Sequence, residues 1–318
     1  MKKIASLLFL STLLVSCMKK ELPLPKPDKG DVITGFSDIG SDYRKQMYFD
    51  LGTNQNVGEN LKTVWDIGLS NNSESIILNA SKVMYAAQVH GKTFDQIADT
   101  TGFAANRRWD APSGNRDSMA IMGHNLFIVD RGIDENGTPQ GWFKLEIIEN
   151  TSATFKGKFA KLDGSNETIL EVAKNPAFNF THISLNGPAH EVAVQPEKDK
   201  WDLYITQFTY VYWLPEFFPY IVVGVLANPS GEVLMKEVTA DKSFDQVDYE
   251  YASSITLSAA QDQIGFDWKT FNGSIYAVQS NRTWVIRDTE GFLYKLRCID
   301  FYNANGLKGC PTFEFQRL

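Results

Sequence analysis

The chain has 318 residues, of which 31 are Lys or Arg and 38 are Asp or Glu, giving a formal net charge of −7. Proteins that bind nucleic acids present an excess of positive charge to the phosphates, whereas this chain has more acidic than basic residues. The composition therefore argues against a nucleic-acid partner.

Residues 1–16 have the layout of a secretory signal peptide. Two lysines precede an apolar run from Ile4 to Val15, which is too short to span a bilayer. The run leads into Leu14-Val15-Ser16-Cys17, which resembles the lipobox after which signal peptidase cuts and the cysteine is acylated. We expect a membrane-anchored lipoprotein with lipid on Cys17. The alternative is an ordinary secreted protein with an incidental cysteine.

Residues 17–32 are rich in proline and charge and predict an extended tether. Charged residues directly behind Cys17 also resemble the surface-export signals of some Gram-negative lipoproteins. We therefore expect a lipoprotein of the outer membrane that is exposed at the cell surface. No later run of about twenty apolar residues offers another membrane anchor.

The rest of the chain contains an ordered internal repeat. Five pairs of similar segments keep their order: 64–67 with 200–203, 92–97 with 242–247, 127–130 with 284–287, 144–148 with 295–299, and Lys156-Gly157 with Lys308-Gly309. Matches that keep their order at offsets between 136 and 157 residues indicate a tandem duplication with loop insertions. We predict two similar domains, residues 33–168 and 172–318, with the boundary between Gly164 and Asn175.

The repeated segments have the period of β-strands. Trp65, Ile67 and Leu69 alternate with smaller or polar residues, and Trp201 and Leu203 begin the same alternation in the second copy. Further short runs rich in β-branched and aromatic residues are separated by turn residues, and no long amphipathic helix competes with them. We therefore predict an all-β fold of two tandem antiparallel modules.

The last predicted hairpin places two cysteines across from each other. Its turn centres near Ala304, so Cys298 and Cys310 lie six residues before and after the centre. Disulfides persist in exported proteins, and we predict one between these residues. The alternative is a pair of buried free thiols on strands whose register is shifted.

Residues 172–318 are similar to the HmuY family of haem-binding bacterial lipoproteins. Three segments carry the resemblance, and they are 200–208, 264–269 and 284–296 through Lys308-Gly309. The resemblance implies an all-β protein of iron acquisition that binds haem, hands it to an outer-membrane receptor and is not an enzyme. Residues 33–168 join mainly through the internal repeat, and a chain of two modules departs from the single module that the family implies.

Haem needs one or two imidazole or thioether ligands and apolar walls. The chain has four histidines and none after His190, so the two histidines that the resemblance implies later in the fold have no counterpart. Met119, Met122 and His124 cluster before a predicted strand and form a candidate ligand group. The alternative is a set of ordinary core methionines at a flexible strand entry.

A second candidate is the aromatic segment from Phe208 to Tyr220, which includes Tyr212, Trp213 and Phe217 and is interrupted by two prolines. Such a segment packs over the core, lines a pocket for a flat ligand or presents an adhesive patch to a partner. We list Tyr212, Trp213 and Phe217 with the methionine group as the candidate cofactor-binding residues.

The chain lacks the sequence motifs of common enzymes: it has no Gly-x-Ser-x-Gly, His-Glu-x-x-His, phosphate-binding loop or Cys-x-x-Cys. The leading hypothesis is haem or porphyrin binding and delivery to an outer-membrane receptor. The alternative hypothesis is a protein- or glycan-binding β module that has lost haem ligation. The sequence identifies neither the ligand nor the domain that carries the site.

Overall fold

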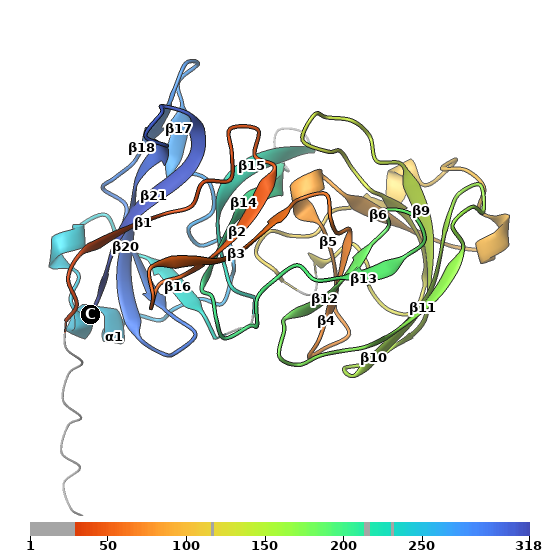
Figure 1. Cartoon of the computed structure of the whole chain (residues 1–318), viewed down its shortest axis with the longest axis horizontal. Helices are drawn as coiled ribbons and strands as arrows, with labels where there is room; N and C mark the ends of the chain where they lie inside the picture. The colour runs from red at the N-terminus through yellow and green to blue at the C-terminus, as the bar shows by residue number, and fades with distance from the viewer. Residues whose placement is uncertain (1–28, 116–117, 213–216, 230–231) are drawn as a thin grey trace, which may run out of the picture.

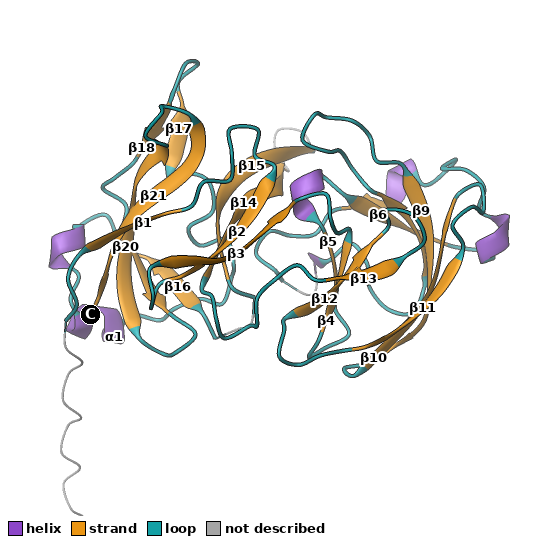
Figure 2. Cartoon of the chain, viewed as in Figure 1, coloured by secondary structure: helices purple, strands orange, loops and turns teal. Residues whose placement is uncertain are grey.

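The computed structural model describes residues 29–115, 118–212, 217–229 and 232–318. The predicted signal peptide, Cys17 and most of the tether lie outside these residues, as does Trp213. The fold is nearly all β, as predicted, and Figure 2 shows strands throughout with only short helical segments. None of the helices in the described ranges has the length and apolar character needed to cross a membrane.

The strands form two lobes that lie along the long axis of the molecule (Figure 1). We call residues 63–195 the first lobe and residues 29–62 with 196–318 the second lobe. Each lobe contains its own hydrophobic core between two sheets, one around Phe127 and Phe159 and the other around Trp268 and Phe313. Burial of these apolar faces is the main force that holds each lobe together.

The first lobe consists of a six-stranded and a four-stranded sheet. The order of the larger sheet is β11 (Thr168–Ala173), β10 (Thr154–Lys161), β9 (Trp142–Asn150), β8 (Leu126–Asp130), β6 (Tyr85–Val89) and β7 (Arg107–Arg108). The order of the smaller sheet is β13 (His190–Val192), β12 (Phe180–Ser184), β4 (Ile67–Ser70) and β5 (Ile76–Leu78).

The second lobe consists of a five-stranded and a four-stranded sheet with an added hairpin. The first order is β1 (Ile33–Phe36), β21 (Lys308–Arg317), β20 (Leu293–Tyr302), β19 (Trp284–Arg287) and β16 (Leu234–Glu237). The second order is β15 (Phe218–Ala227), β14 (Leu203–Tyr212), β2 (Lys45–Asp50) and β3 (Gln55–Leu61). The hairpin pairs β17 (Lys269–Phe271) with β18 (Tyr276–Val278).

Short helices complete the connections. The α-helix α1 spans Tyr249–Ser254, and single 3₁₀ turns lie at η1 (Ala80–Lys82), η2 (Phe94–Gln96), η3 (Ala104–Asn106) and η5 (Phe244–Gln246). Turns η2 and η5 share a local design, because each begins with a capping box formed by Thr93 with Gln96 or by Ser243 with Gln246.

The two lobes repeat buried polar contacts at matched sequence positions. The Lys144 Nζ donates to the carbonyls of Phe94 and Ile97, each at 3.1 Å, and the Lys295 Nζ donates to those of Phe244 and Val247 at 2.7 and 3.0 Å. In each lobe an asparagine amide also donates to the carbonyl of the tryptophan in the Trp-Asp pair, Asn79 to Trp65 and Asn228 to Trp201. The duplication itself stays a prediction, but these shared contacts are what it leads one to expect.

The strand pairing groups the chain differently from the predicted division into 33–168 and 172–318. In the second lobe β1 pairs with β21, β2 with β14 and β3 with β2, whereas β12, beyond the predicted boundary, pairs with β4 in the first lobe. Figure 1 shows the red N-terminal strand β1 beside the blue C-terminal strand β21. Sequence similarity marks related segments but contains no information about which lobe receives the N-terminal strands.

The predicted disulfide is not formed, since Cys298 and Cys310 are both buried free thiols. The register of the last hairpin explains the error. The turn centres at Asn305, since Tyr302 pairs with Lys308, and irregularities between Cys298 and Tyr302 leave a net of one extra residue on β21, so Cys298 lies opposite Phe313 and not opposite Cys310. Burial raises the pKa of the Cys298 thiol to about 12 and that of Cys310 to about 11, which keeps both in the unreactive protonated form.

A substitution at Gly35 tests whether β1 is an integral part of the second lobe. A Cβ added there would lie 2.7 Å from Phe49 Cζ and 2.8 Å from Phe313 Cε2, both in the lobe core. Gly35→Ala should lower the free energy of unfolding by about 1–3 kcal/mol, measured by urea denaturation. Gly52→Ala is the control, because the nearest atom to its added Cβ is 3.4 Å away. Equal stability of the two variants would contradict the assignment.

Candidate functional site

A cleft between the lobes collects cationic, aromatic and thioether side chains. Its cavity volume is about 650 Å³, and its walls are Ala104, Ala105, Arg107, Arg108, Trp109, Ser118, Met119, Val211 and Phe217. We call it the arginine–aromatic cleft. The residues up to Met119 belong to the first lobe, whereas Val211 and Phe217 come from strand β14 and the connection to β15 in the second lobe.

Local structure positions the two arginines at the cleft. They form the short strand β7, in which Arg107 pairs with Ala87 and Arg108 with Ala86 at the edge of the six-stranded sheet. The Arg107 guanidinium lies over the ring of Trp109 at 5.4 Å from its centroid. This cation–π contact orients the charge while leaving the side chain exposed.

The aromatic wall of the cleft is built across the two lobes. The Trp109 and Phe217 rings meet with centroids 5.4 Å apart, and Trp109 also packs against Tyr85 at 4.8 Å. The Trp109 indole Nε1 donates to the Val83 carbonyl at 3.3 Å, which fixes the ring relative to the first lobe. Arg107 and Arg108 are the only ionised side chains among the lining residues, so the cleft favours an anionic or amphipathic ligand.

The predicted site residues fall into three groups. Met119 and Phe217 line the cleft together, although they were predicted from separate segments. Met122, 47% exposed, lines a neighbouring cavity of about 440 Å³ with Met119. His124 and Tyr212 are exposed at the surface and do not line the cleft, and Trp213 lies outside the described residues.

Sequence reasoning missed Arg107, Arg108 and Trp109 as functional residues. The signal that could have found them is the run of two arginines followed by a tryptophan in an otherwise acidic chain. None of the four histidines lines the cleft. His90, His124 and His190 are exposed elsewhere, and His182 is buried beside Trp65. In the described ranges, no three His, Cys, Asp or Glu side chains form a group that could hold a metal ion.

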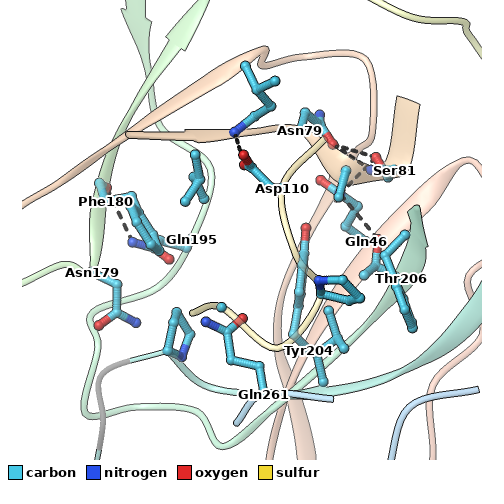
Figure 3. A pocket seen from close by; sticks show the side chains of 18 of the residues that line it. Gln46, Asn79, Ser81, Asp110, Asn179, Phe180, Gln195, Tyr204, Thr206 and Gln261 are labelled. Carbon is cyan, nitrogen blue, oxygen red and sulfur yellow. Dashed lines mark hydrogen bonds between the residues drawn. The ribbon is translucent and has the colours of Figure 1, made fainter. Parts of the chain in front are cut away.

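A second cavity, of about 150 Å³, lies at the junction of the lobes, and we call it the junction cavity. It shares Met119 with the arginine–aromatic cleft. Figure 3 shows Asp110 and Gln261 on opposite sides of it, with Tyr204 between them. Both Asp110 oxygens accept backbone N–H groups, from Leu78 at 2.6 Å and Ala120 at 2.7 Å, and burial raises the pKa of Asp110 to about 6.

The family assignment follows from comparison with known proteins. The model of the HmuY protein family matches residues 42–315, a single span that includes parts of both lobes, and the chain belongs to this family. Members of the family bind and transport haem and are not enzymes, which confirms the prediction that this chain is not one. No curated protein matches the chain.

Solved structures of low similarity also match. Apo PinO from Porphyromonas gingivitis has 9% identity over 91% of this chain and 97% of its own, with a TM-score of 0.29. The apo HmuY analog TFO from Tannerella forsythia has 11% identity over 91% of this chain and 98% of its own, with a TM-score of 0.25. At these TM-scores the likeness carries no argument about the site.

The buried His182 beside the junction cavity makes stability depend on pH. Burial lowers its pKa from 6.5 to about 3, so between these values the unfolded chain binds a proton that the folded protein does not. The folded protein is therefore most stable with respect to His182 above pH 6.5, and its free energy of unfolding decreases as the pH falls below that value. From pH 7 to pH 5 the contribution of His182 should weaken by about 2 kcal/mol.

His182→Gln should therefore show a smaller loss of unfolding free energy from pH 7 to pH 5 than the unsubstituted protein, measured by urea denaturation at each pH. The exposed His190 offers the matched control, and His190→Gln should keep the full loss. Parallel pH profiles for all three proteins would show that His182 is protonated in the folded state.

Proposed function

We propose that the chain captures haem in the arginine–aromatic cleft. The main observation in support of this proposal is that one cavity brings together the Met119 thioether, the Trp109 and Phe217 rings and the guanidinium groups of Arg107 and Arg108. Haem offers a matching set of features, namely an iron that accepts thioether ligands, a flat apolar ring and two carboxylates. Family membership supports the same ligand class.

The donor set fits haem residue by residue. Met119 would hold the iron, because a thioether is one of the axial ligands that haem proteins use and the cleft contains no histidine. Trp109 and Phe217 would cover the ring, and the arginines would bind the carboxylates through charge-assisted hydrogen bonds. The cavity volume of about 650 Å³ also lies within the range of small-molecule sites, roughly 300–1,000 Å³.

The cleft is bordered by exposed aromatic side chains, and this suggests how haem is handed on. Phe218 and Tyr220, on strand β15 next to Phe217, are 55% and 51% exposed. In the proposed cycle, the lipidated Cys17 anchors the chain to the outer membrane at the cell surface, and the exposed aromatic edge contacts an outer-membrane receptor that accepts the haem. Apolar side chains exposed beside a ligand site are typical of contact surfaces.

Haemin titration followed by Soret absorbance tests the iron ligand. Met119→Leu conserves volume and apolar character, so it should leave the fold intact while reducing haemin affinity at least tenfold and abolishing the spectrum of thioether ligation. Met122→Leu, a change of the same chemistry at an exposed neighbour, should bind haemin like the unsubstituted protein. Unchanged spectra and affinity in Met119→Leu would refute ligation by Met119.

A second titration tests the carboxylate contacts. Replacing both Arg107 and Arg108 with Ala should weaken haemin binding by about tenfold to a hundredfold per lost charge-assisted contact, and raised salt should reduce the difference. Arg287→Ala, which removes an exposed cation from strand β19, should have no such effect. Equal haemin affinity in the double variant and this control would exclude the arginines from the site.

Haemin titration of the unsubstituted protein also distinguishes haem binding from the alternative, which is a protein- or glycan-binding module without haem. This alternative predicts that the Soret band of micromolar haemin has the same position and intensity with and without the unsubstituted protein.

A further inference from the structure

We propose that the junction cavity is a separate binding site for a neutral sugar of a single ring. The site lies between the lobes, with Asn79, Asp110 and Asn179 from the first lobe and Tyr204, Trp201 and Gln261 from the second. This inference is independent of haem binding and concerns a ligand of different size and chemistry.

The volume of the cavity limits the ligand to one ring. A cavity of about 150 Å³ matches the size that holds a single benzene ring in another protein, and because the junction cavity is partly open to solvent, a sugar ring would be enclosed on one side with its remaining hydroxyl groups in water. A porphyrin contains several such rings, so the junction cavity cannot take the ligand proposed for the larger cleft.

Two buried donors in the wall of the cavity lack a hydrogen-bond acceptor among the described residues. They are the Trp201 indole Nε1, with Trp201 only 1% exposed, and the Tyr204 hydroxyl, whose oxygen can accept from the Tyr48 and Thr206 hydroxyls but whose proton has no acceptor in the described part of the chain. An unpaired buried donor costs about 1–3 kcal/mol, and native proteins contain few of them. Two such donors beside one cavity indicate that an acceptor bound there would pair with them.

Amide side chains add unused polar groups from other directions. The Gln261 side chain makes no hydrogen bond to the described residues, whereas both of its backbone groups are bonded, the N–H to the Ser113 carbonyl and the carbonyl to the Ala227 N–H. Asn179 and Gln195 each donate one hydrogen bond, to Asn228 Oδ1 and to the Phe180 carbonyl, and their side-chain oxygens accept none within the described ranges. Figure 3 shows these three side chains along one flank and the floor of the cavity.

This arrangement favours a ring with several hydroxyl groups over a flat heterocycle. Amide and phenol groups donate and accept, as sugar hydroxyls do, and here they approach the cavity from several sides and not within one plane. The aromatic rings of Tyr48, Trp65 and Phe180 supply apolar surface between the polar groups. Polar groups spread over an otherwise apolar wall are the usual composition of a specific small-ligand site.

The electrostatics of the cavity favour a neutral ligand. None of its lining residues is a lysine or arginine, so an anion would be desolvated there without a partner. Burial lowers the pKa of His182 to about 3, which keeps this lining side chain uncharged at neutral pH. Asp110 already accepts two backbone hydrogen bonds and can accept a further one from a hydroxyl group.

Thermal unfolding of the full chain with single neutral sugars tests the proposal. The panel is D-glucose, D-galactose, D-mannose and N-acetyl-D-glucosamine, each titrated to 50 mM. At about ten times its Kd, a binding sugar should raise Tm by about 2–4 °C. Sugars also stabilise proteins by exclusion from their surface, but for a given sugar that effect is the same for every variant.

Two variants locate the effect. Tyr204→Phe removes only the hydroxyl group, and Gln261→Met removes only the amide at matched length, so both should lose most of the sugar-specific rise in Tm. Tyr210→Phe is the matched control, because Tyr210 lies on the same strand and packs against Tyr212 and Phe266 outside the cavity. Its response should equal that of the unsubstituted protein.

Three outcomes would overturn the inference. A uniform rise in Tm across the panel and all variants would mean that ordered water alone fills the cavity, since it has room for about five water molecules. A response to phenol, titrated as a flat probe of a single ring, and to no sugar would assign a flat ligand. A sugar response that Tyr204→Phe and Gln261→Met retain would place the sugar elsewhere. None of these results depends on haemin, which is titrated separately.

Discussion

Two buried aspartates hold together the parts of the chain that form the sites. Asp202 accepts the N–H of Leu51 at 2.9 Å and that of Thr289, also at 2.9 Å, and so ties the end of β2 to the turn before β20. Asp66 accepts the N–H of Leu185 at 2.7 Å at the end of β12. In each lobe a carboxylate thus joins a strand from a distant part of the sequence to the lobe that it completes, and the loops that line the cavities extend from these sandwiches.

The two carboxylates are compensated differently. Asp66 is paired with Lys82 and Arg131, which are themselves buried. Asp202 receives backbone and hydroxyl donors but no cation among the described residues, and burial raises its pKa to about 7. Breaking either contact leaves a buried polar group without a partner, which is one of the costlier changes a fold can suffer. The N-terminal strands therefore belong to the second lobe energetically as well as by strand pairing.

The sequence predicted what depends on local pattern and missed what depends on long-range register. Period-two alternation at Trp65 and Trp201 predicted strands, and the repeated Phe-Asp-Gln segments form the same capped 3₁₀ turn in both lobes. The predicted disulfide was wrong, because the register of β20 and β21 places Cys298 opposite Phe313 and not opposite Cys310. Met119 and Phe217 were predicted as separate possibilities, since no local signal places them in one cleft.

Consecutive residues connect the two cavities. Trp109 lines the arginine–aromatic cleft, its neighbour Asp110 lines the junction cavity, and Met119 lines both. The backbone between these cavities is anchored by the Asp110 carboxylate, which holds the N–H groups of Leu78 and Ala120. A ligand that hydrogen-bonds to Asp110 would therefore lie directly beside Trp109, which lines the arginine–aromatic cleft. Met119 directly precedes Ala120 in the chain. Any displacement of the Ala120 N–H would therefore move the Met119 thioether as well, so a change at one cavity would be transmitted to the other.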